Sequence, residues 1–423
     1  MICCPYGTIG KSIMSLKTLR QIRNLAGKRV LVRVDFNVPV KKGKVLEDSR
    51  LLASLSTITY LLEKKAKVIL VTHRGRPEGI DKNLSIKPVA QRLQEILNLK
   101  FLGNTNTPQV EIFKQFSISN LEFSKYFEKI NQTIHKMKNG QIIMLENIRF
   151  FADEKKDTND FSKNLAGLGD MFVLDGFAVA HRDSGSVTGV ATYLPSYAGL
   201  LLEKEIKGLT KVLQKPKSPF VVVLGGAKME TKIPVIKNLL PKCDYMLIGG
   251  GIVNTYLKAK GYKVGGSLVD KDFQKEVLKY CRSKKVIKPI DVVVGTFDGK
   301  KYGVVDINSK FKISNSKLMI FDIGPKTIKL YATYIKQAQT LVWNGAMGLF
   351  EQKPYDVGTL SIARLVASRS KGQAYGVIGG GETLQSMDMV GMTQDIDLVS
   401  TGGGAMLEFL SGKVLPGIKV LQK

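Results

Sequence analysis

Short apolar runs followed by glycines or polar clusters recur along this chain. They are clearest at Phe220–Leu224, Tyr245–Ile248 and Tyr375–Ile378, each of which ends at two or three glycines and precedes an amphipathic helical pattern. Near-continuous apolar strands that alternate with helices indicate parallel sheets covered on both faces. We therefore expect an α/β fold in which ligands bind beyond the carboxyl ends of the strands.

The residues at these strand ends differ between the two halves of the chain. Arginine, histidine, aspartate and asparagine follow the strands of the first half, whereas glycine and lysine follow those of the second. The 423 residues are enough for two domains of about 200 residues each. We predict an anion-binding domain over residues 1–198, a nucleotide-binding domain over residues 199–400 and a final segment over residues 401–423. A helix over Glu203–Leu213 would join the halves.

The first half contains candidate anion ligands. Alternation from Val30 to Val38 predicts a strand on which Arg33, Asp35 and Asn37 share one face. Such polar groups are costly in a buried strand unless they pair or bind something, so they form either an Arg33–Asp35 ion pair or part of a binding site. Arginine favours carboxylate and phosphate because its planar fork binds two oxygens. The other candidates at strand ends or helix starts are Arg50, His73, Arg76, Arg149, Asp175, His181 and Arg182.

The second half contains candidate phosphate ligands. Leu224–Lys228 closes a strand with two glycines and a lysine, and Lys232 follows four residues after Lys228, which predicts both ammonium groups on one helix face. Gly250 and Gly251 open another helical pattern. Glycines let the backbone approach phosphates, and helix starts supply N–H donors. This pattern is not the phosphate-binding P-loop motif, and alone it is weak evidence.

Two further glycine loops lie at strand ends, in Gly379–Thr383 and Ser400–Gly404. Several helix starts at one sheet edge favour an anionic ligand. Glu382 would either hold Mg²⁺, which prefers carboxylate, water and phosphate oxygens, or only place a negative charge at its helix start. Asn344 closes another strand, and Glu351 would accept ribose hydroxyls.

The net charge of +28 arises from 64 lysines and arginines against 36 acidic residues. It indicates either a lysine-rich solvated surface or a nucleic-acid partner, and we favour the first because the lysines are spread along the chain. No apolar run approaches the ~18 residues of a membrane helix. The four cysteines form no CxxC pair, so we expect neither a zinc site nor a disulfide framework, and we expect a cytoplasmic protein.

Eight blocks occur in the order and spacing of the phosphoglycerate kinase family, which the chain resembles from about Leu16 to its C-terminus. They are VRVDFNVP (32–39), HRGRP (73–77), LENIRF (145–150), LGGAKMETK (224–232), DIGPKT (322–327), VWNGAMGLFE (342–351), IGGGET (378–383) and STGGGAMLEFLSGK (400–413).

The resemblance implies two doubly wound, Rossmann-like parallel-sheet domains joined by a hinge helix, with a C-terminal tail that returns to the N-terminal domain. It also implies a monomer that transfers a phosphoryl group reversibly, with Mg²⁺, from 1,3-bisphosphoglycerate to ADP, giving 3-phosphoglycerate and ATP. The implied substrate ligands are Asp35, Asn37, Arg50, His73, Arg76, Arg149 and Arg182. The implied nucleotide ligands are Gly226, Ala227, Lys228, Lys232, Gly250, Gly251, Asn344, Glu351, Gly379, Gly380, Gly381, Glu382 and Thr383. The implied catalytic groups are Arg50, Lys228, Gly381 and Gly404, with Glu382 at the metal.

Four places depart from the family pattern. Leu174–Val179 stands where the family resembles NDAFGT, and Asp183–Ser186 stands where it has AHSS, so a second histidine is missing. Ala346 replaces a proline, and Glu382 replaces an aspartate. The departures leave two alternatives open, a kinase for another acyl phosphate and a basic nucleic-acid-binding or scaffold protein on the same fold. Residues 1–13 precede the resemblance, and we expect them to be unstructured or Met14 to be the true start.

Overall fold

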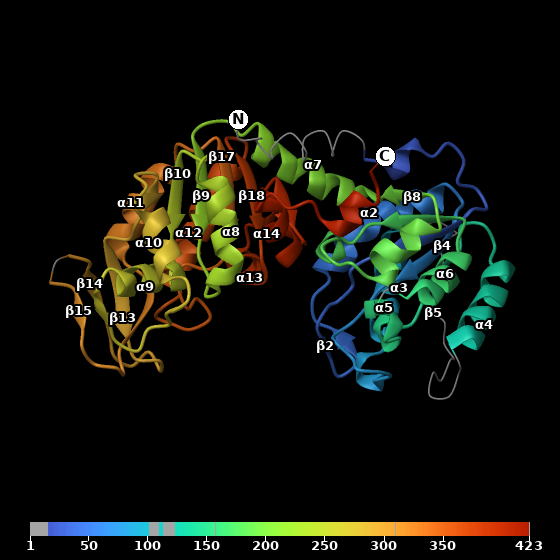
Figure 1. The fold of residues 1–423 in the computed structure, drawn as a ribbon, viewed down its shortest axis with the longest axis horizontal. Helices are drawn as coiled ribbons and strands as arrows, with labels where there is room; N and C mark the ends of the chain where they lie inside the picture. The colour runs from blue at the N-terminus through green and yellow to red at the C-terminus, as the bar shows by residue number, and fades with distance from the viewer. Residues whose placement is uncertain (1–15, 101–109, 113–122, 157, 309, 423) are drawn as a thin grey trace. The chain divides into compact units, whose positions relative to one another are not determined.

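A computed structural model describes residues 16–100, 110–112, 123–156, 158–308 and 310–422 of the chain (Figure 1). The expectations for residues 1–13 and Met14 lie outside this described part. The chain forms two compact units, one of Met1–Ile206 together with Val414–Lys423 and the other of Lys207–Lys413. The boundaries suggested by the sequence were residues 198 and 400, so the units divide 8 and 13 residues later, at residues 206 and 413.

The first unit is built on a six-stranded sheet with the strand order β5-β6-β4-β1-β7-β8, in which every neighbouring pair is parallel. Its strands are β1 (Arg29–Arg33), β4 (Lys67–Val71), β5 (Val110–Ile112), β6 (Ile142–Met144), β7 (Met171–Leu174) and β8 (Ser196–Ala198). Its helices are α2 (Ser49–Glu63), α3 (Lys87–Lys100), α4 (Phe123–Lys136), α5 (Asp153–Lys156), α6 (Asn159–Gly167) and α15 (Pro416–Lys419). A short hairpin joins β2 (Val40–Lys41) and β3 (Lys44–Val45).

The second unit repeats this plan with the order β12-β10-β9-β17-β18-β19, again entirely parallel. Its strands are β9 (Phe220–Leu224), β10 (Tyr245–Ile248), β12 (Val286–Ile287), β17 (Thr340–Asn344), β18 (Tyr375–Gly379) and β19 (Leu398–Ser400). Its helices are α8 (Met229–Leu239), α9 (Gly250–Ala259), α10 (Gln274–Cys281), α11 (Pro325–Ile335), α12 (Val357–Ser370), α13 (Gly381–Val390) and α14 (Gly404–Leu410).

Smaller sheets complete the second unit. An antiparallel sheet has the order β14-β13-β16, with β13 (Asp291–Gly295), β14 (Tyr302–Asp306) and β16 (Met319–Ile323). A two-stranded sheet pairs β11 (Lys263–Val264) with β15 (Lys312–Ile313).

Both large sheets grow in two directions from their first strand. In the first unit β4 lies on one side of β1 and β7 on the other, and in the second unit β10 and β17 flank β9. Because crossovers between parallel strands are right-handed, this order places helices on both faces of each sheet. All five residues of β9 are buried, as expected of a strand covered on both faces. The predicted fold of two doubly wound parallel-sheet units is confirmed.

The chain crosses the boundary between the units twice, once in helix α7 and once near its C-terminus. Helix α7 (Leu200–Gln214) runs from the first unit into the second, past the boundary at Ile206, and covers the helix expected over Glu203–Leu213. The C-terminal segment returns to the first unit, where Gly417 N donates to Ala180 O at 2.8 Å and Lys17 N donates to Leu421 O at 3.1 Å. No helix in the described part of the chain is long and apolar enough to span a membrane.

Candidate active site

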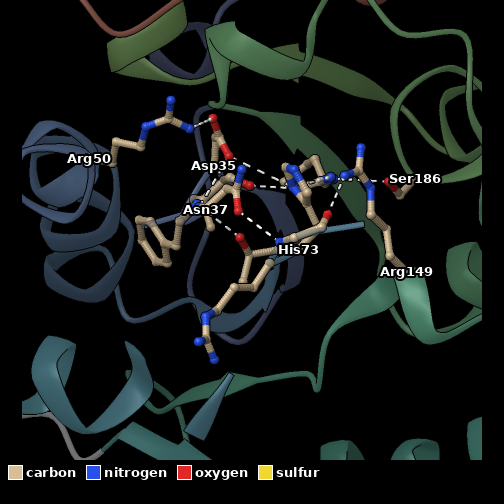
Figure 2. Close-up of polar contacts among 12 residues, drawn as sticks. Asp35, Asn37, Arg50, His73, Arg149 and Ser186 are labelled. Atoms are coloured by element: carbon tan, nitrogen blue, oxygen red, sulfur yellow. Dashed lines mark hydrogen bonds and ion pairs between the residues drawn. The ribbon is translucent and has the colours of Figure 1, made fainter. Parts of the chain in front are cut away.

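The anion-binding candidates of the first unit gather at one edge of its sheet. Strands β4, β1 and β7 are neighbours, β6 adjoins β4, and all four run parallel, so their carboxyl ends meet at one edge. Asp35 and Asn37 follow β1, His73 follows β4, Arg149 follows β6 and Arg182 follows β7. Figure 2 shows Asp35, Asn37 and His73 between Arg50 and Arg149. The structure therefore brings together residues that are more than a hundred positions apart.

Asp35 anchors one side of this group. Its Oδ2 accepts a hydrogen bond from Arg50 Nη1 in a close ion pair, and its Oδ1 accepts from the backbone N of Asn37 at 3.3 Å. Arg50 lies in the first turn of α2, where its guanidinium remains partly exposed. The carboxylate thus holds the arginine at the sheet edge while leaving several of its N–H donors free for a ligand.

The Gly75 turn anchors the other side. Asn37 Oδ1 accepts from Gly75 N at 2.9 Å, and Arg149 Nη1 donates to Gly75 O at 2.7 Å. Gly75 has φ +66°, and a Cβ there would lie 2.9 Å from Leu84 Cδ2, so any other residue would strain the backbone and displace the leucine side chain. The turn places the following residue, Arg76, on the exposed side of the site.

Four nitrogen atoms in this region are buried and have no hydrogen-bond partner among the described residues. They are His73 Nε2, Arg149 Nε, His181 Nδ1 and Arg182 Nη1. Buried polar atoms without partners are rare, and each costs roughly 1–3 kcal/mol. The two arginine nitrogens carry hydrogens and lack acceptors, which an anion at this edge would supply.

The positive charges of the region also favour the binding of an anion. Burial, together with Arg33, Arg182 and Arg50, lowers the pKa of His73 well below its usual value, so the ring is neutral at physiological pH. Burial lowers the pKa of Arg182 as well; Asp35 acts in the opposite direction, and Arg76 and Arg50 add to the lowering. A cluster of like charges of this kind is relieved when an anion binds.

Two expectations for the first unit are wrong in their details. The expected strand over Val30–Val38 ends at Arg33, and Arg33 does not share a surface with Asp35 and Asn37 or form an ion pair with Asp35 in the described chain. Its guanidinium turns inward and donates to Ser186 Oγ and Val34 O. Asp175 is not at the anion site either, because its carboxylate accepts from Thr57 Oγ1 at 2.6 Å and so faces α2.

The second unit contains a cavity of about 340 Å³ at the carboxyl edge of its sheet. Cavities of this size hold small ligands. Of the residues expected around a nucleotide, those that line it are Gly226, Ala227, Gly250, Gly251, Glu351 and Glu382. Much of the remaining wall is apolar and comprises Val253, Leu268, Val292, Phe297, Met319, Ile320, Phe321, Ile323, Met347, Leu349 and Phe350. The cavity therefore combines a glycine-rich rim with an apolar slot.

The glycine rim is held by backbone contacts. Gly226 N donates to Ala346 O at 2.7 Å, and Gly250 N donates to Met347 O at 2.8 Å. Gly250 has φ +57°, and a Cβ there would lie 2.9 Å from Gly226 N. Ala346 replaces the expected proline. The contact uses its backbone carbonyl, which a proline at this position would also have.

The prediction that Lys228 and Lys232 share one helix face is wrong. Lys228 precedes α8 in an extended conformation and is exposed, whereas Lys232 is buried inside the helix with its Nζ hydrogen-bonded to Asn344 Oδ1. Burial lowers the pKa of Lys232 to about 8, against the opposing charge of Glu382. Spacing alone missed this because the helix begins one residue after Lys228.

The remaining predicted residues form a layer behind the rim. Asn344 Nδ2 donates to Gly379 O at 2.5 Å, and Gly345 N donates to Thr383 Oγ1 at 2.7 Å. This layer connects β17 to the loop before α13. Gly381 and Gly404 begin α13 and α14, as expected of residues that present helix N–H groups.

Glu382 fits a magnesium site with a single protein carboxylate. Its Oε2 accepts from Ala346 N at 3.3 Å, and the residue is exposed and lines the cavity. Within the described residues there is no group of three or more His, Cys, Asp or Glu side chains that would hold a metal by itself. Mg²⁺ is commonly held by one or two carboxylates with substrate phosphates and water, so one exposed carboxylate beside a phosphate site is a compatible donor set.

The chain is similar to known proteins over almost its whole length. The family model described as phosphoglycerate kinase matches residues 19–413. The chain belongs to the phosphoglycerate kinase family.

Relatives and solved structures agree with this membership. The phosphoglycerate kinase of Borreliella afzelii (strain PKo) is 42% identical over 417 residues, which cover 97% of this chain and 100% of the relative. That of Dictyoglomus turgidum is 42% identical over 418 residues, with the same coverage. The structure of phosphoglycerate kinase from Coxiella burnetii matches with a TM-score of 0.79 and 36% identity, covering 96% of this chain and 98% of that chain. Membership implies a kinase that binds a nucleotide and small-molecule substrates.

Sequence reasoning missed several residues of the two candidate sites. Ser186 accepts a hydrogen bond from Arg33 and donates one to Glu154. Asn147 holds the backbone of Arg74 with two hydrogen bonds: its side chain accepts from Arg74 N at 3.2 Å and donates to Arg74 O at 2.7 Å. In the second unit Asn254 lines the cavity with a buried Oδ1. Asn147 lies three residues after the end of β6, between that strand and Arg149, and this position near a strand end would have revealed it.

Proposed function

We propose that this chain transfers a phosphoryl group, with Mg²⁺, between 1,3-bisphosphoglycerate and ADP, forming 3-phosphoglycerate and ATP reversibly. The observation that supports this most directly is the set of four buried nitrogen atoms without partners at the edge of the first sheet. They match a small ligand with several anionic oxygens. Family membership supplies the kinase class, and the glycine-rimmed cavity suits a nucleotide.

The first unit would bind the glycerate and its phosphate. Arginine forks bind two oxygens at once, and a neutral imidazole donates one further hydrogen bond. Asp35 and Asn37 would orient the cations and contact the substrate hydroxyl. The full set of proposed ligands is Asp35, Asn37, Arg50, His73, Arg76, Arg149 and Arg182.

The second unit would bind the nucleotide. Its base would enter the apolar slot, and Glu351 would accept from the ribose hydroxyls. The phosphates would lie against Gly226 and Ala227 and the start of α13, with the exposed Lys228 just before α8. Bound Mg²⁺ would neutralise phosphate charge, and Glu382 is the carboxylate that would hold it.

Transfer would proceed in line. The bond between phosphorus and the acyl oxygen breaks, the bond between phosphorus and the β-phosphate oxygen forms, and the glycerate leaves as a carboxylate. Catalysis of this kind depends on positioning and on neutralising charge on the transferred group. We assign the neutralisation to Arg50, Lys228 and the backbone N–H groups at Gly381 and Gly404.

A coupled assay with 3-phosphoglycerate, ATP and Mg²⁺ tests the proposal. We expect turnover by the parent chain and a loss of about 10²- to 10³-fold in kcat in Arg50→Ala and in Lys228→Ala. Matched controls are Arg23→Ala and Lys237→Ala, which remove exposed cations from the same two units and should retain full activity. A folded parent without turnover would overturn the proposal.

The loop at Asp183–Ser186 motivates one alternative substrate class. Ser184 stands where the family has a histidine, and its hydroxyl turns inward to Glu154 Oε1 at 2.9 Å. The first unit therefore lacks one imidazole that relatives offer. An assay in the ATP-forming direction, with ADP and either acetyl phosphate or 1,3-bisphosphoglycerate, distinguishes a kinase for another acyl phosphate from the proposed enzyme. The proposed enzyme should strongly prefer 1,3-bisphosphoglycerate.

A further inference from the structure

Arg33 is a cation at the end of β1 that the proposed substrate site does not use. The side chain is 0% exposed. Its Nη1 donates to Val34 O at 2.5 Å, its Nε donates to Ser186 Oγ at 3.0 Å and its Nη2 lies 3.3 Å from His73 Nδ1. Burying a guanidinium is costly unless its donors are satisfied, so each of these contacts fixes its position.

Glu154 completes the surroundings of Arg33. This glutamate of α5 is 3% exposed, and its Oε1 accepts from Ser186 Oγ at 2.7 Å and from Ser184 Oγ at 2.9 Å. Burial lowers the pKa of Arg33 to about 10, while Glu154 and Asp35 act in the opposite direction, so the guanidinium stays charged at neutral pH. Glu154, Ser186 and Arg33 therefore form a continuous chain of contacts that ends at His73.

The contact between Arg33 and His73 decides which ring nitrogen carries the proton. A guanidinium only donates hydrogen bonds, so Nδ1 of His73 must accept, and a neutral ring then carries its proton on Nε2. Asp35 is the competing partner, but its Oδ1 lies 3.7 Å from Nδ1, beyond hydrogen-bond distance. Each Asp35 oxygen also already accepts one hydrogen bond, from Arg50 and from the Asn37 backbone.

We propose that Glu154, Ser186 and Arg33 are positioning residues that hold His73 in the Nε2–H tautomer and so make Nε2 a hydrogen-bond donor. His73 Nε2 is one of the buried atoms without a partner, as a donor that awaits an anion would be. The step from tautomer to substrate contact rests on the proposed function. The tautomer itself does not.

The tautomer can be measured in the parent chain without any ligand. The sequence contains three histidines, so long-range ¹H–¹⁵N correlation spectra of histidine-labelled protein show three rings, and a His73→Gln variant identifies the signals of His73. We expect the pattern of a neutral ring protonated at Nε2. A ring protonated at Nδ1, or at both nitrogens at neutral pH, would overturn the proposal.

Two serines provide a matched pair for the role of the chain of contacts. Ser186→Ala removes the hydroxyl that links Glu154 to Arg33, whereas Ser184→Ala removes a hydroxyl that donates to the same Oε1 but does not contact Arg33. In Ser186→Ala we expect a mixture of His73 tautomers and a KM for 3-phosphoglycerate raised about three- to tenfold, the effect of one lost hydrogen bond, with kcat unchanged. Ser184→Ala should match the parent in its His73 tautomer and in its KM for 3-phosphoglycerate.

The outcomes separate the two proposals. An unchanged His73 spectrum in Ser186→Ala, or equal changes in both serine variants, would show that the serine link does not position the ring. The expected spectra in a parent without turnover would instead support the positioning chain and reject the proposed function.

Discussion

Asp175, directly after β7, is a fully buried carboxyl group that faces the first turn of α7. Its Oδ1 accepts from Thr57 Oγ1 at 2.6 Å and from Leu201 N at 3.1 Å. Burial raises the pKa of Asp175 to about 6, from an ordinary 3.8, although these hydrogen bonds act in the opposite direction. The folded chain therefore binds a proton here more tightly than the unfolded chain does.

The raised pKa of Asp175 makes the stability of the fold depend on pH. This stabilising contribution is fully present below pH 3.8 and is lost as the pH rises through about 6. Asp175→Asn keeps the Oδ1 acceptor but cannot titrate. We expect the free energy of unfolding of the parent, relative to the variant, to fall by roughly 3 kcal/mol between pH 4 and pH 7, as denaturant titrations would measure.

Asp170 provides a control of opposite sign. Burial opposes its ionisation, but hydrogen bonds from Arg29, one of them at 2.7 Å, outweigh this and lower the pKa of Asp170. Its stabilising contribution is present above the ordinary pKa and lost as the pH falls. The difference between the parent and Asp170→Asn should therefore shrink toward low pH. If the Asp175→Asn difference stayed constant with pH, the buried carboxyl would be ionised throughout.

At the level of residues, the sequence predicted which side chains gather but not what each one does. Polar residues after apolar runs correctly placed His73 and Arg149 at one sheet edge, because parallel strands end at a common edge. Arg33 was grouped with Asp35 by alternation alone. Its actual partners, Ser186 and His73, lie 153 and 40 positions away, and no local pattern carries that information.

At the level of elements, α9 carries a glycine with positive φ at its start and another just beyond its end. Gly250 has φ +57° and Gly261 has φ +88°. A Cβ at Gly250 would lie 2.9 Å from Gly226 N and 3.0 Å from Ala346 O, whereas a Cβ at Gly261 would meet nothing within 4 Å. The two positions therefore separate backbone strain from steric displacement of the cavity rim.

We expect Gly261→Ala to cost about 1–2 kcal/mol of stability, the strain of a left-handed alanine, and to leave nucleotide affinity unchanged. Gly250→Ala should cost at least as much and also weaken ADP binding, because the added methyl displaces Gly226 from the cavity rim. Unfolding curves and calorimetric titration with ADP measure the two effects. Equal ADP affinity in both variants would show that the cavity rim accommodates the added methyl group without weakening ADP binding.

Apolar runs predicted the central strands of the second unit well, and β9 and β10 have the expected bounds. The strand expected over Val30–Val38 was too long for a physical reason. Val34 N still donates to Val71 O at 3.0 Å, but Phe36 N donates to the side chain of Thr72 at 2.9 Å. A side-chain acceptor replaces the neighbouring strand's carbonyl there, and alternation of apolar residues cannot register that change.

At the level of the whole molecule, the final ten residues complete a unit that the chain left some two hundred residues earlier. Val414–Lys423 belongs with the first unit, and Leu415, Ile418 and Leu421 are buried there. Gly417 N donates to Ala180 O, directly before His181 and Arg182. The resemblance implied such a returning tail, whereas no pattern in residues 401–423 indicates where it packs.

Leu421→Ala tests how far the stability of the two units is shared. Removing a buried leucine side chain costs roughly 2–5 kcal/mol, and here the loss falls on the first unit. The single tryptophan, Trp343, is buried in the second unit, so its fluorescence reports on that unit while far-ultraviolet circular dichroism reports on both. We expect an earlier transition by circular dichroism and an unchanged tryptophan transition.

Val414→Ala is the matched control, because this side chain is 41% exposed in the same segment and its loss should shift neither transition measurably. If Leu421→Ala lowered the tryptophan transition as much as the circular dichroism transition, the two units would unfold as one cooperative body. In that case α7 would be the first element to test, because its residues on either side of Ile206 belong to different units.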